Sequence, residues 1–175
     1  MNTVEPAPFA LRTIETRDDG STLRAASLRV MPPETVYSLC VLRQDVFILE
    51  QGVTGEPELD GRDLETGTVL IWWEKDHKVI GTIRVLDDGG HFRIGRLACA
   101  KSARRGGYGR GLMNAAIRVC REIDPTQKIV IHGQSYLKDW YESIGYVTVG
   151  PEFLEEGIPH YPMEMAPESP RPDAA

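Results

Sequence analysis

The stretch FRIGRLACAKSARRGGYGRGLM, residues 92–113, decides the fold of this 175-residue chain. Phe92, Ile94 and Leu97 lie in a run of β-forming character, which predicts a strand over residues 92–99. A basic loop rich in glycine follows. Apolar residues then recur at helical spacing, at Leu112, Met113, Ala116, Ile117 and Cys120. The stretch therefore predicts a strand, a loop and a helix over about residues 109–123, in that order.

The loop in this stretch has the features of a phosphate site. Backbone N–H groups at a helix start point outward beside the positive end of the helix dipole, and they favour a bound anion. Glycines keep side chains away from these amides, and arginines can pair with a diphosphate. The residues concerned are Gly107, Gly109, Gly111, Arg104, Arg105 and Arg110.

The spacing of the glycines narrows the choice of ligand. Leu112 follows Gly111, so the Lys-Ser/Thr pair of an NTP-cleaving loop is missing. The glycines also miss the dinucleotide fingerprint, and the next predicted strand, residues 128–132, ends in no carboxylate. The pattern that fits is Arg104-x-x-Gly107-x-Gly109 after Leu97-Ala98-Cys99, which resembles the acetyl-coenzyme A signature of the GNAT acyltransferase superfamily.

Further motifs extend this resemblance from about residue 36 to residue 165. In chain order they are RQDVF at 43–47 with EQ at 50–51, ELDGRD at 58–63, WY at 140–141 with GY at 145–146, and EGIPH at 156–160. Together they are similar to the ElaA-like branch of the superfamily. Two positions depart from it. GVTG stands at 52–55 where many relatives have Cys-Pro-Tyr, which leaves the acceptor open, and Gly133 replaces an alanine, a conservative change.

Length and composition indicate one ordinary globular domain. Hydrophobic residues make up 41% of the chain and charged residues 26%, and 175 residues are too few for two comfortable domains. We expect a single acyltransferase domain over residues 21–166. A partly disordered N-terminal extension over residues 1–20 and a disordered, proline-rich tail over residues 167–175 complete the prediction.

Charge and cysteine content limit the partners. The net charge of -6 argues against a nucleic-acid partner. No apolar run is long enough to cross a bilayer, no secretory leader is recognisable, and Cys40, Cys99 and Cys120 are odd in number and lie in apolar segments. We therefore expect a cytoplasmic protein with no membrane association.

Neither a CxxC pair nor a histidine cluster is present, so no metal is expected. An exposed last strand could pair across a homodimer.

Hydrophobic periodicity and turn residues place the other elements. A hairpin or leading strand pair is expected around residues 18–21, and a helix begins at Pro33. Further strands are predicted over residues 69–74, 79–86, 128–132, 146–149 and 158–165, and a second helix over residues 134–143. Trp72 and Trp73 are adjacent, so one of them must point away from the main core. By spacing alone Arg43 is a solvated helix residue, but the resemblance favours a functional one.

These elements predict a mixed α/β (α+β) fold, with a largely antiparallel central sheet flanked by helices. The resemblance implies a GNAT fold, in which the sheet is splayed between residues 92–99 and 128–134 to admit the pantetheine arm of acetyl-CoA. The residues that the resemblance assigns to acetyl-CoA are Leu97, Ala98, Cys99, Arg104, Arg105, Gly106, Gly107, Tyr108, Gly109 and Arg110.

The resemblance also implies direct transfer of an acetyl group from acetyl-CoA to an amine in a ternary complex. Tyr141 matches a tyrosine that faces the coenzyme sulfur, and we favour this acid role over the alternative of a core aromatic beside Trp140. For the general base, Glu50 and His160 rank equally and His132 is a third choice. The acidic segment of residues 50–63 is either a solvated loop or the lip of the acceptor pocket. The predicted acceptor-binding residues are Arg43, Glu58, Asp60 and Gln134.

Three function classes follow from these observations. The first is an acetyl-CoA-dependent N-acetyltransferase that acts on a primary amine of a small molecule or a protein. The second is a regulatory or sensor module that binds coenzyme A without turnover. The third is a related acyl-transfer enzyme with another acyl donor, since autoinducer synthases share a similar fold.

Overall fold

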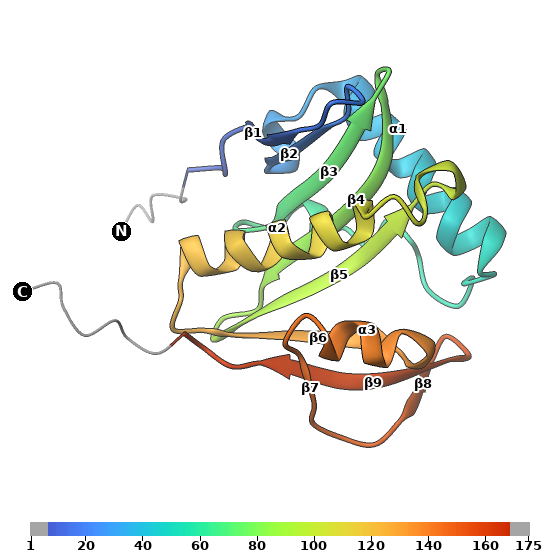
Figure 1. The fold of residues 1–175 in the computed structure, drawn as a ribbon, viewed down its shortest axis with the longest axis vertical. Helices are drawn as coiled ribbons and strands as arrows, with labels where there is room; N and C mark the ends of the chain where they lie inside the picture. The colour runs from blue at the N-terminus through green and yellow to red at the C-terminus, as the bar shows by residue number, and fades with distance from the viewer. Residues whose placement is uncertain (1–6, 169–175) are drawn as a thin grey trace, which may run out of the picture.

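The computed structural model describes residues 7–168, and these form a single open sheet with helices on both faces (Figure 1). The nine strands of this part of the chain are β1 (Arg12–Thr16), β2 (Thr22–Ala26), β3 (Val69–Lys75), β4 (Lys78–Asp87), β5 (His91–Cys99), β6 (Lys128–Gln134), β7 (Val147–Thr148), β8 (Phe153–Glu155) and β9 (Ile158–Met165). Their order in the sheet is β1-β2-β3-β4-β5-β6-β9-β7, and β8 pairs with β9. Only the β5–β6 pairing is parallel among the ladders of the described residues.

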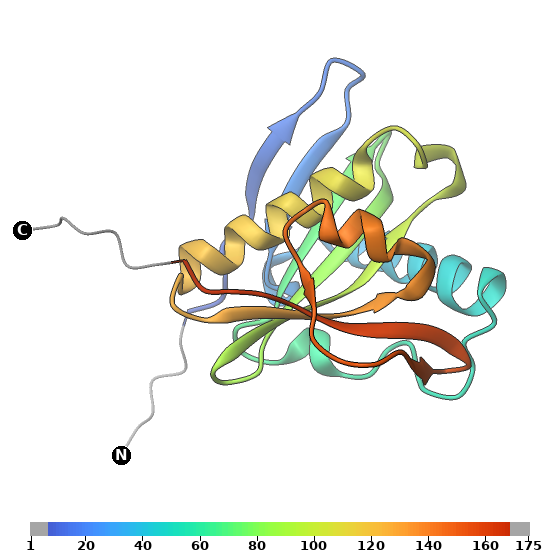
Figure 2. The ribbon, with the colours of Figure 1, turned by 60° about the horizontal axis from the view of Figure 1, so that its bottom comes forward.

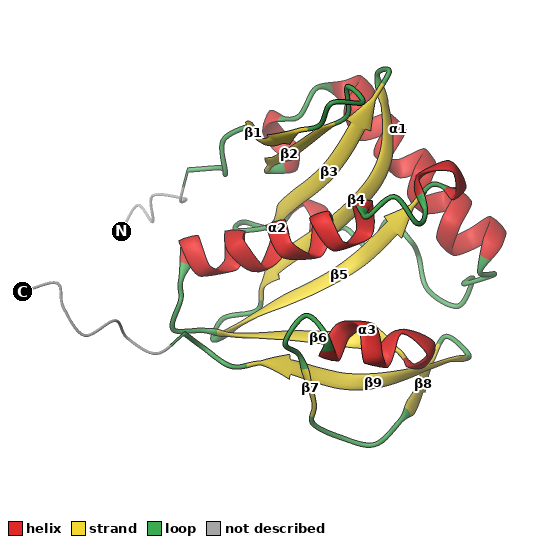
Figure 3. Ribbon diagram, in the orientation of Figure 1, coloured by secondary structure: helices red, strands yellow, loops and turns green. Residues whose placement is uncertain are grey.

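The helices connect these strands (Figure 3). They are α1 (Pro33–Arg43), which continues as the π-helix η2 (Gln44–Glu50), α2 (Tyr108–Ile123) and α3 (Lys138–Glu142). Short 3-10 turns lie at η1 (Leu28–Val30), η3 (Arg62–Leu64), η4 (Lys101–Ala103) and η5 (Ser135–Leu137). The predicted mixed α/β fold, the central strands and the helix after the glycine-rich loop are confirmed.

The hairpin predicted around residues 18–21 is confirmed, because β1 and β2 pair antiparallel on either side of it. β1 lies within the range predicted as an N-terminal extension, and the domain boundaries at residues 20/21 and 166/167 stay predictions. The disorder predicted at the two ends concerns mostly residues 1–6 and 169–175, which lie outside the described residues.

Two predictions in the C-terminal third are wrong in detail. The second helix was expected from residue 134, but Gln134 is the last residue of β6 and α3 starts only at Lys138. Long-range pairing explains this, since Gln134 is opposite His160 of β9. Strand β8 was missed, because it has three residues and is defined by its hairpin with β9. Glu156 and Gly157 turn that hairpin with φ of 50° and 76°, as a two-residue type I′ turn requires.

The helices lie in two layers. α2 and α3 cover one face of the sheet and α1 covers the other (Figures 1 and 2). Trp73 is fully buried under α2, where its indole N–H donates to the carbonyl oxygen of Tyr108 at 3.2 Å. Trp72 is fully buried on the opposite face, in the cluster that includes Leu39 of α1. The prediction that the two adjacent tryptophans point to opposite faces is confirmed, and each packs in a separate hydrophobic cluster.

The sheet opens between β5 and β6. Their parallel ladder contains the pairs His91–Lys128, Phe92–Ile129 and Arg93–Val130, and beyond these pairs the strands diverge (Figure 1). β5 continues along β4 as far as Cys99, and β6 continues along β9 as far as Gln134. The splay predicted between these two strands is therefore confirmed.

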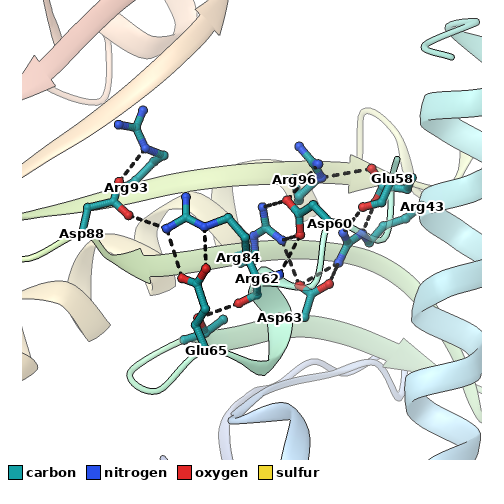
Figure 4. A network of polar contacts seen from close by, with 11 residues as sticks. Arg43, Glu58, Asp60, Arg62, Asp63, Glu65, Arg84, Asp88, Arg93 and Arg96 are labelled. Atoms are coloured by element: carbon teal, nitrogen blue, oxygen red, sulfur yellow. Dashed lines mark hydrogen bonds and ion pairs between the residues drawn. The ribbon is translucent and has the colours of Figure 1, made fainter. Parts of the chain in front are cut away.

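A network of ion pairs fixes the acidic segment that follows η2 to one face of the sheet (Figure 4). Arg43, only 1% exposed, donates to both carboxylate oxygens of Asp63 at 3.0 and 3.1 Å and to the Glu58 carbonyl at 3.0 Å. It also pairs with the Glu58 carboxylate. Arg84 of β4 binds both oxygens of Asp60 at 2.8 Å. Burial by itself would raise the pKa of Asp60, but Arg84 overcomes this and the pKa is lowered to about 2.

The network corrects the first interpretation of Arg43. The solvated position that helical spacing suggested is wrong, because the acidic segment folds back over the end of α1 and buries the guanidinium group. The same network extends along the sheet. Arg96 of β5 pairs with Glu58 and Asp60, and Arg62 links Glu65 to Asp88.

Gly133→Ala tests the packing beside the splay. A Cβ at Gly133 would lie 2.9 Å from the ring of Tyr141 and 3.0 Å from the sulfur of Met163, so the change is not conservative here. We expect the variant to lose about 1–3 kcal/mol of unfolding free energy, as overpacked cores do. Gly95→Ala is the control, because its Cβ would meet no atom within 4 Å. Urea denaturation that finds the two variants equally stable would contradict this packing.

Arg43→Met tests the network. The change leaves Asp63 and Glu58 without their main cationic partner in a mostly buried position, so we expect a loss of about 3–5 kcal/mol of unfolding free energy. Arg118→Met, on the exposed side of α2, should change stability little. Adding Asp63→Asn to Arg43→Met should restore part of the loss, because it removes the stranded charge. Thermal denaturation at pH 7 measures the stability of all three variants. An Arg43→Met variant as stable as the wild type would contradict the structural role of Arg43 in the network.

Candidate functional site

A cavity of about 810 Å³ opens where β5 and β6 separate. β5 and the glycine-rich loop form one wall, and β6 with α3 forms the other. The end of η2, the acidic segment and the β8–β9 hairpin close it on the side away from α2. Residues 52–55, where the sequence departs from the ElaA-like pattern, lie on this side of the cavity. They are close to the hairpin, since a Cβ at Gly55 would clash with the carboxylate of Glu156. The site thus combines an open strand edge with a helix start.

The glycine-rich loop ends in the N-terminus of α2. Gly107 precedes the helix with φ of 76°, a left-handed conformation that glycine adopts without strain. Gly109, in the first turn, lines the cavity, and a Cβ added there would come no nearer than 3.8 Å to any atom, the closest being the sulfur of Cys99. The first-turn N–H groups of this 16-residue helix have no partner within the helix itself. An anion at this end would meet backbone donors and the positive end of the dipole.

The residues predicted to bind acetyl-CoA divide into two groups. Those that line the cavity are Leu97, Ala98, Cys99, Arg104, Arg105 and Gly109. The others lie in the loop and the first helical turn, outside the cavity wall: Gly106, Gly107, Tyr108 and Arg110. The Tyr108 side chain is buried, and its hydroxyl donates to Asp19 at 2.5 Å. Hydrogen bonds from Ser21 and Tyr108 hold the pKa of Asp19 below its usual range. The Tyr108 side chain therefore anchors the loop, and only the backbone of Tyr108 is left to contact a ligand.

Glu50 and Arg104, predicted to serve different substrates, bind each other. Arg104 donates to the two Glu50 carboxylate oxygens at 2.7 and 2.8 Å and to the Cys99 carbonyl at 3.1 Å. The hydrogen bond from Arg104 holds the pKa of Glu50 below its usual range, against desolvation. A carboxylate with a lowered pKa is a weaker proton acceptor, so this arrangement does not favour Glu50 as the base.

Tyr141 of α3 lines the cavity from the α2 side of the sheet. Its ring packs edge-on against Trp140 and Tyr146, at centroid distances of 4.9 and 6.2 Å. Burial raises the pKa of Tyr141 above its usual range, so its hydroxyl keeps its proton at neutral pH. Tyr141 is thus both a core aromatic and a neutral hydroxyl at the site.

Two histidines and a glutamate from β6, β8 and β9 meet at the cavity. His132 of β6 has Nδ1 2.8 Å from Oε1 of Glu155, and His160 of β9 has Nε2 3.7 Å from the other oxygen. His160 is 7% exposed and its Nδ1 lies 2.8 Å from the Ile158 carbonyl oxygen. The hydrogen bond with His132 lowers the pKa of Glu155 despite desolvation. Sequence analysis missed Glu155, because only the pairing of β8 with β9 brings it to His132.

The predicted acceptor residues do not all reach the cavity. Glu58, Asp60 and Gln134 line it, whereas Arg43 lies behind Glu58 with its N–H groups bound to Glu58 and Asp63. Sequence analysis also missed cavity arginines that bind these acids, Arg84 and Arg96. Arg96 has φ of 54°, next to a register shift between β4 and β5, and this irregularity cannot be read from local sequence.

The described residues contain neither a metal-ligand cluster nor a membrane-spanning helix. Within residues 7–168, no three His, Cys, Asp or Glu side chains are grouped so that they could hold a metal ion. None of the helices in that range has the length and apolar character needed to cross a membrane.

Comparison with known proteins identifies the family. A model described as an acetyltransferase (GNAT) domain matches residues 52–167. A UPF0039 protein of Mycobacterium tuberculosis is 39% identical over 146 residues, which cover 81% of this chain and 90% of that protein. Protein ElaA of Escherichia coli is 30% identical over 131 residues, covering 73% of this chain and 85% of ElaA.

Solved structures agree with these sequence matches. The crystal structure of Escherichia coli ElaA aligns with a TM-score of 0.76 at 26% identity, covering 82% of this chain and 97% of that one. The crystal structure of an acyl-CoA N-acyltransferase from Pseudomonas aeruginosa aligns with a TM-score of 0.77 at 28% identity, covering 82% and 99%. With its splayed sheet and glycine-rich helix start, this chain belongs to the GNAT acetyltransferase family, in the ElaA-like branch.

Proposed function

We propose that this protein is an acetyl-CoA-dependent N-acetyltransferase that transfers an acetyl group directly to a primary amine in a ternary complex. Family membership supports acyl transfer. The observation that carries the proposal further is the open edge of β5 beside the N-terminus of α2. An extended thioester arm fits the first feature, and a pyrophosphate fits the second.

The chain offers specific groups for the coenzyme. Beyond Arg93, the β5 edge that faces β6 has no strand across from it in the described ladder, so backbone groups of Leu97 and Cys99 can pair with an extended amide chain as an added strand would. The loop amides between Arg104 and Gly111 would hold the pyrophosphate, whereas the N–H groups of these two residues already donate to the carbonyls of Lys101 and Gly107. Arg104, which stays paired with Glu50, would add positive charge beside this anion site.

Acetyl transfer requires three chemical tasks of this site. A backbone N–H near Ala98 can stabilise negative charge on the thioester oxygen. The neutral hydroxyl of Tyr141 can donate a proton to the leaving sulfur. A base must keep the attacking amine neutral.

The wall around the acceptor side is charged but balanced. Glu58 and Asp60, the carboxylates expected to attract a cationic amine, are paired with Arg43, Arg84 and Arg96. Their attraction for an amine is therefore weaker than the acidic segment suggests. Shape and hydrogen bonding carry more of the selection, so either a small-molecule amine or a protein amine is compatible with the wall.

Gly109→Glu tests the coenzyme site. Calorimetric titration of the wild type with acetyl-CoA should show one site per chain. The added carboxylate in the first turn of α2 should weaken binding by about tenfold or more, because it repels the pyrophosphate. Gly109→Ala should bind like the wild type, since a Cβ fits there. If the glutamate variant binds equally well, the pyrophosphate does not lie at this helix start.

Thiol release tests whether bound acetyl-CoA is used. The wild type is incubated with acetyl-CoA and each of spermidine, tyramine and a lysine-containing peptide, and coenzyme A thiol is measured. Acetylation of at least one of these amines is expected. Stoichiometric binding without thiol release on these amines and a wider amine library would instead indicate the sensor module.

Tyr141→Phe tests proton delivery to sulfur. The variant keeps the buried ring but loses the donor, so we expect kcat to fall on the order of 10²-fold with little change in acetyl-CoA affinity. Tyr136→Phe is the matched control, because this tyrosine also lines the cavity but is 75% exposed. An unchanged kcat for Tyr141→Phe would remove Tyr141 from the mechanism.

A further inference from the structure

Side chains from three different strands form a connected group on one wall of the cavity. His132 comes from β6, Glu155 from β8 and His160 from β9, and all three line the cavity. Glu155 lies between the two rings, with one oxygen 2.8 Å from Nδ1 of His132 and the other 3.7 Å from Nε2 of His160. Phe153 packs edge-on against the His132 ring at 5.0 Å. The His132 ring is thus fixed by a carboxylate and an aromatic ring.

This arrangement sets the protonation pattern of His132. An ionised carboxylate only accepts hydrogen bonds, so Nδ1 of His132 carries the proton. The neutral ring then has its lone pair on Nε2. In the sheet order, β9 and β8 lie on the far side of β6 from β5. Glu155 comes from that side and contacts Nδ1, so Nε2 is the ring nitrogen that Glu155 leaves unoccupied in a side chain that lines the cavity.

The other two base candidates are engaged. Both oxygens of Glu50 accept from Arg104, which lowers its pKa. His160 is buried, with Nδ1 against the Ile158 carbonyl and Nε2 toward Glu155. His132 is the member of this set whose second ring nitrogen has no protein partner among the described contacts, and 39% of its side chain is exposed.

We propose that His132 is the general base of the acyl transfer and that Glu155 is its positioning residue. This inference rests on the proposed function. His132 also lies two residues beyond Val130, the last β6 residue paired with β5. It is therefore at the point where the two strands begin to separate.

The proton balance of the step is complete. Nε2 of His132 takes one proton from the ammonium form of the acceptor and later releases it to water. The amine nitrogen attacks the thioester carbon, a C–N bond forms and the C–S bond breaks. The leaving sulfur takes the proton of Tyr141, and the tyrosinate recovers the second proton that the nitrogen loses on becoming an amide.

Charged groups from three strands lie around His132. Glu155 from β8 is its direct partner, His160 of β9 lies on the other side of that carboxylate, and Arg96 of β5 is close enough to lower the pKa of Glu155. Glu155→Gln removes the charge of the direct partner but keeps an acceptor oxygen, whereas Glu155→Leu removes both.

The first experiment measures the tautomer of His132 without any acceptor. Two-dimensional ¹H–¹⁵N NMR of the imidazole groups, assigned with single-histidine variants, should show neutral His132 as the Nδ1–H tautomer. Glu155→Leu, which removes both acceptor oxygens, should abolish the preference for this tautomer. Glu152→Leu is the control, because this exposed carboxylate directly precedes β8 in the chain, and it should leave the tautomer unchanged.

The second experiment measures kcat/KM against pH, with the amine of the above panel that the wild type acetylates fastest. His132→Gln should lower kcat on the order of 10²-fold and abolish the inflection on the acid side, with acetyl-CoA affinity unchanged. Glu155→Gln should keep the inflection and lower kcat with KM for acetyl-CoA unchanged, a split between kcat and KM that a purely structural role would not produce. Glu50→Gln and His160→Gln should keep the inflection.

The two experiments separate the inference from the function on which it rests. An Nε2–H tautomer, or a tautomer that Glu155→Leu leaves unchanged, overturns the pairing of His132 with Glu155 even if acetyltransferase activity is present. Loss of the acid inflection in Glu50→Gln or His160→Gln, but not in His132→Gln, assigns the base elsewhere. If the wild type acetylates no amine, the base role falls together with the proposed function, whatever the NMR shows.

Discussion

The fold depends on how a sheet can be opened between two of its inner strands. Backbone N–H and C=O groups inside a sheet are costly when unpaired, yet β5 and β6 part after Arg93 and Val130. Each strand is held on its outer side, β5 by β4 and β6 by β9, so the opening does not unravel the sheet. The end of η2 spans it, through Glu50 to Arg104 and through Gln51 to Gln134. Every other part of the site is placed relative to this opening.

The ion-pair network is the second constraint, and it explains why an acidic chain has a balanced cavity wall. Five arginines (Arg43, Arg62, Arg84, Arg93 and Arg96) meet five carboxylates (Glu58, Asp60, Asp63, Glu65 and Asp88) over one face of the sheet (Figure 4). A buried ion pair is a weak source of net stability, but its geometry is demanding. The network therefore fixes where the segment after η2 lies, and so the shape of the acceptor side.

Local sequence was sufficient for features that depend on neighbours along the chain. The strand, loop and helix of residues 92–113 could be read from spacing, and adjacent Trp72 and Trp73 had to occupy opposite faces. Local sequence was insufficient where contacts with distant segments of the chain determine the structure. Gln134 belongs to a strand because of β9, Arg43 is buried because the acidic segment folds over it, and Glu155 matters because of His132, 23 residues away. No local pattern distinguishes these residues from ordinary helical or turn residues.

Tyr141 and His132, the two groups proposed to transfer protons, lie on opposite faces of β6. Gly133 faces Tyr141, as the close approach of their atoms requires, and side chains alternate along β6, so His132 faces the other way. Burial keeps the Tyr141 hydroxyl protonated at neutral pH, whereas Nδ1 of His132 lies 2.8 Å from the Glu155 carboxylate. A thioester arm between β5 and β6, as proposed, would have the donor for its sulfur on one side of β6 and the base for the ammonium on the other.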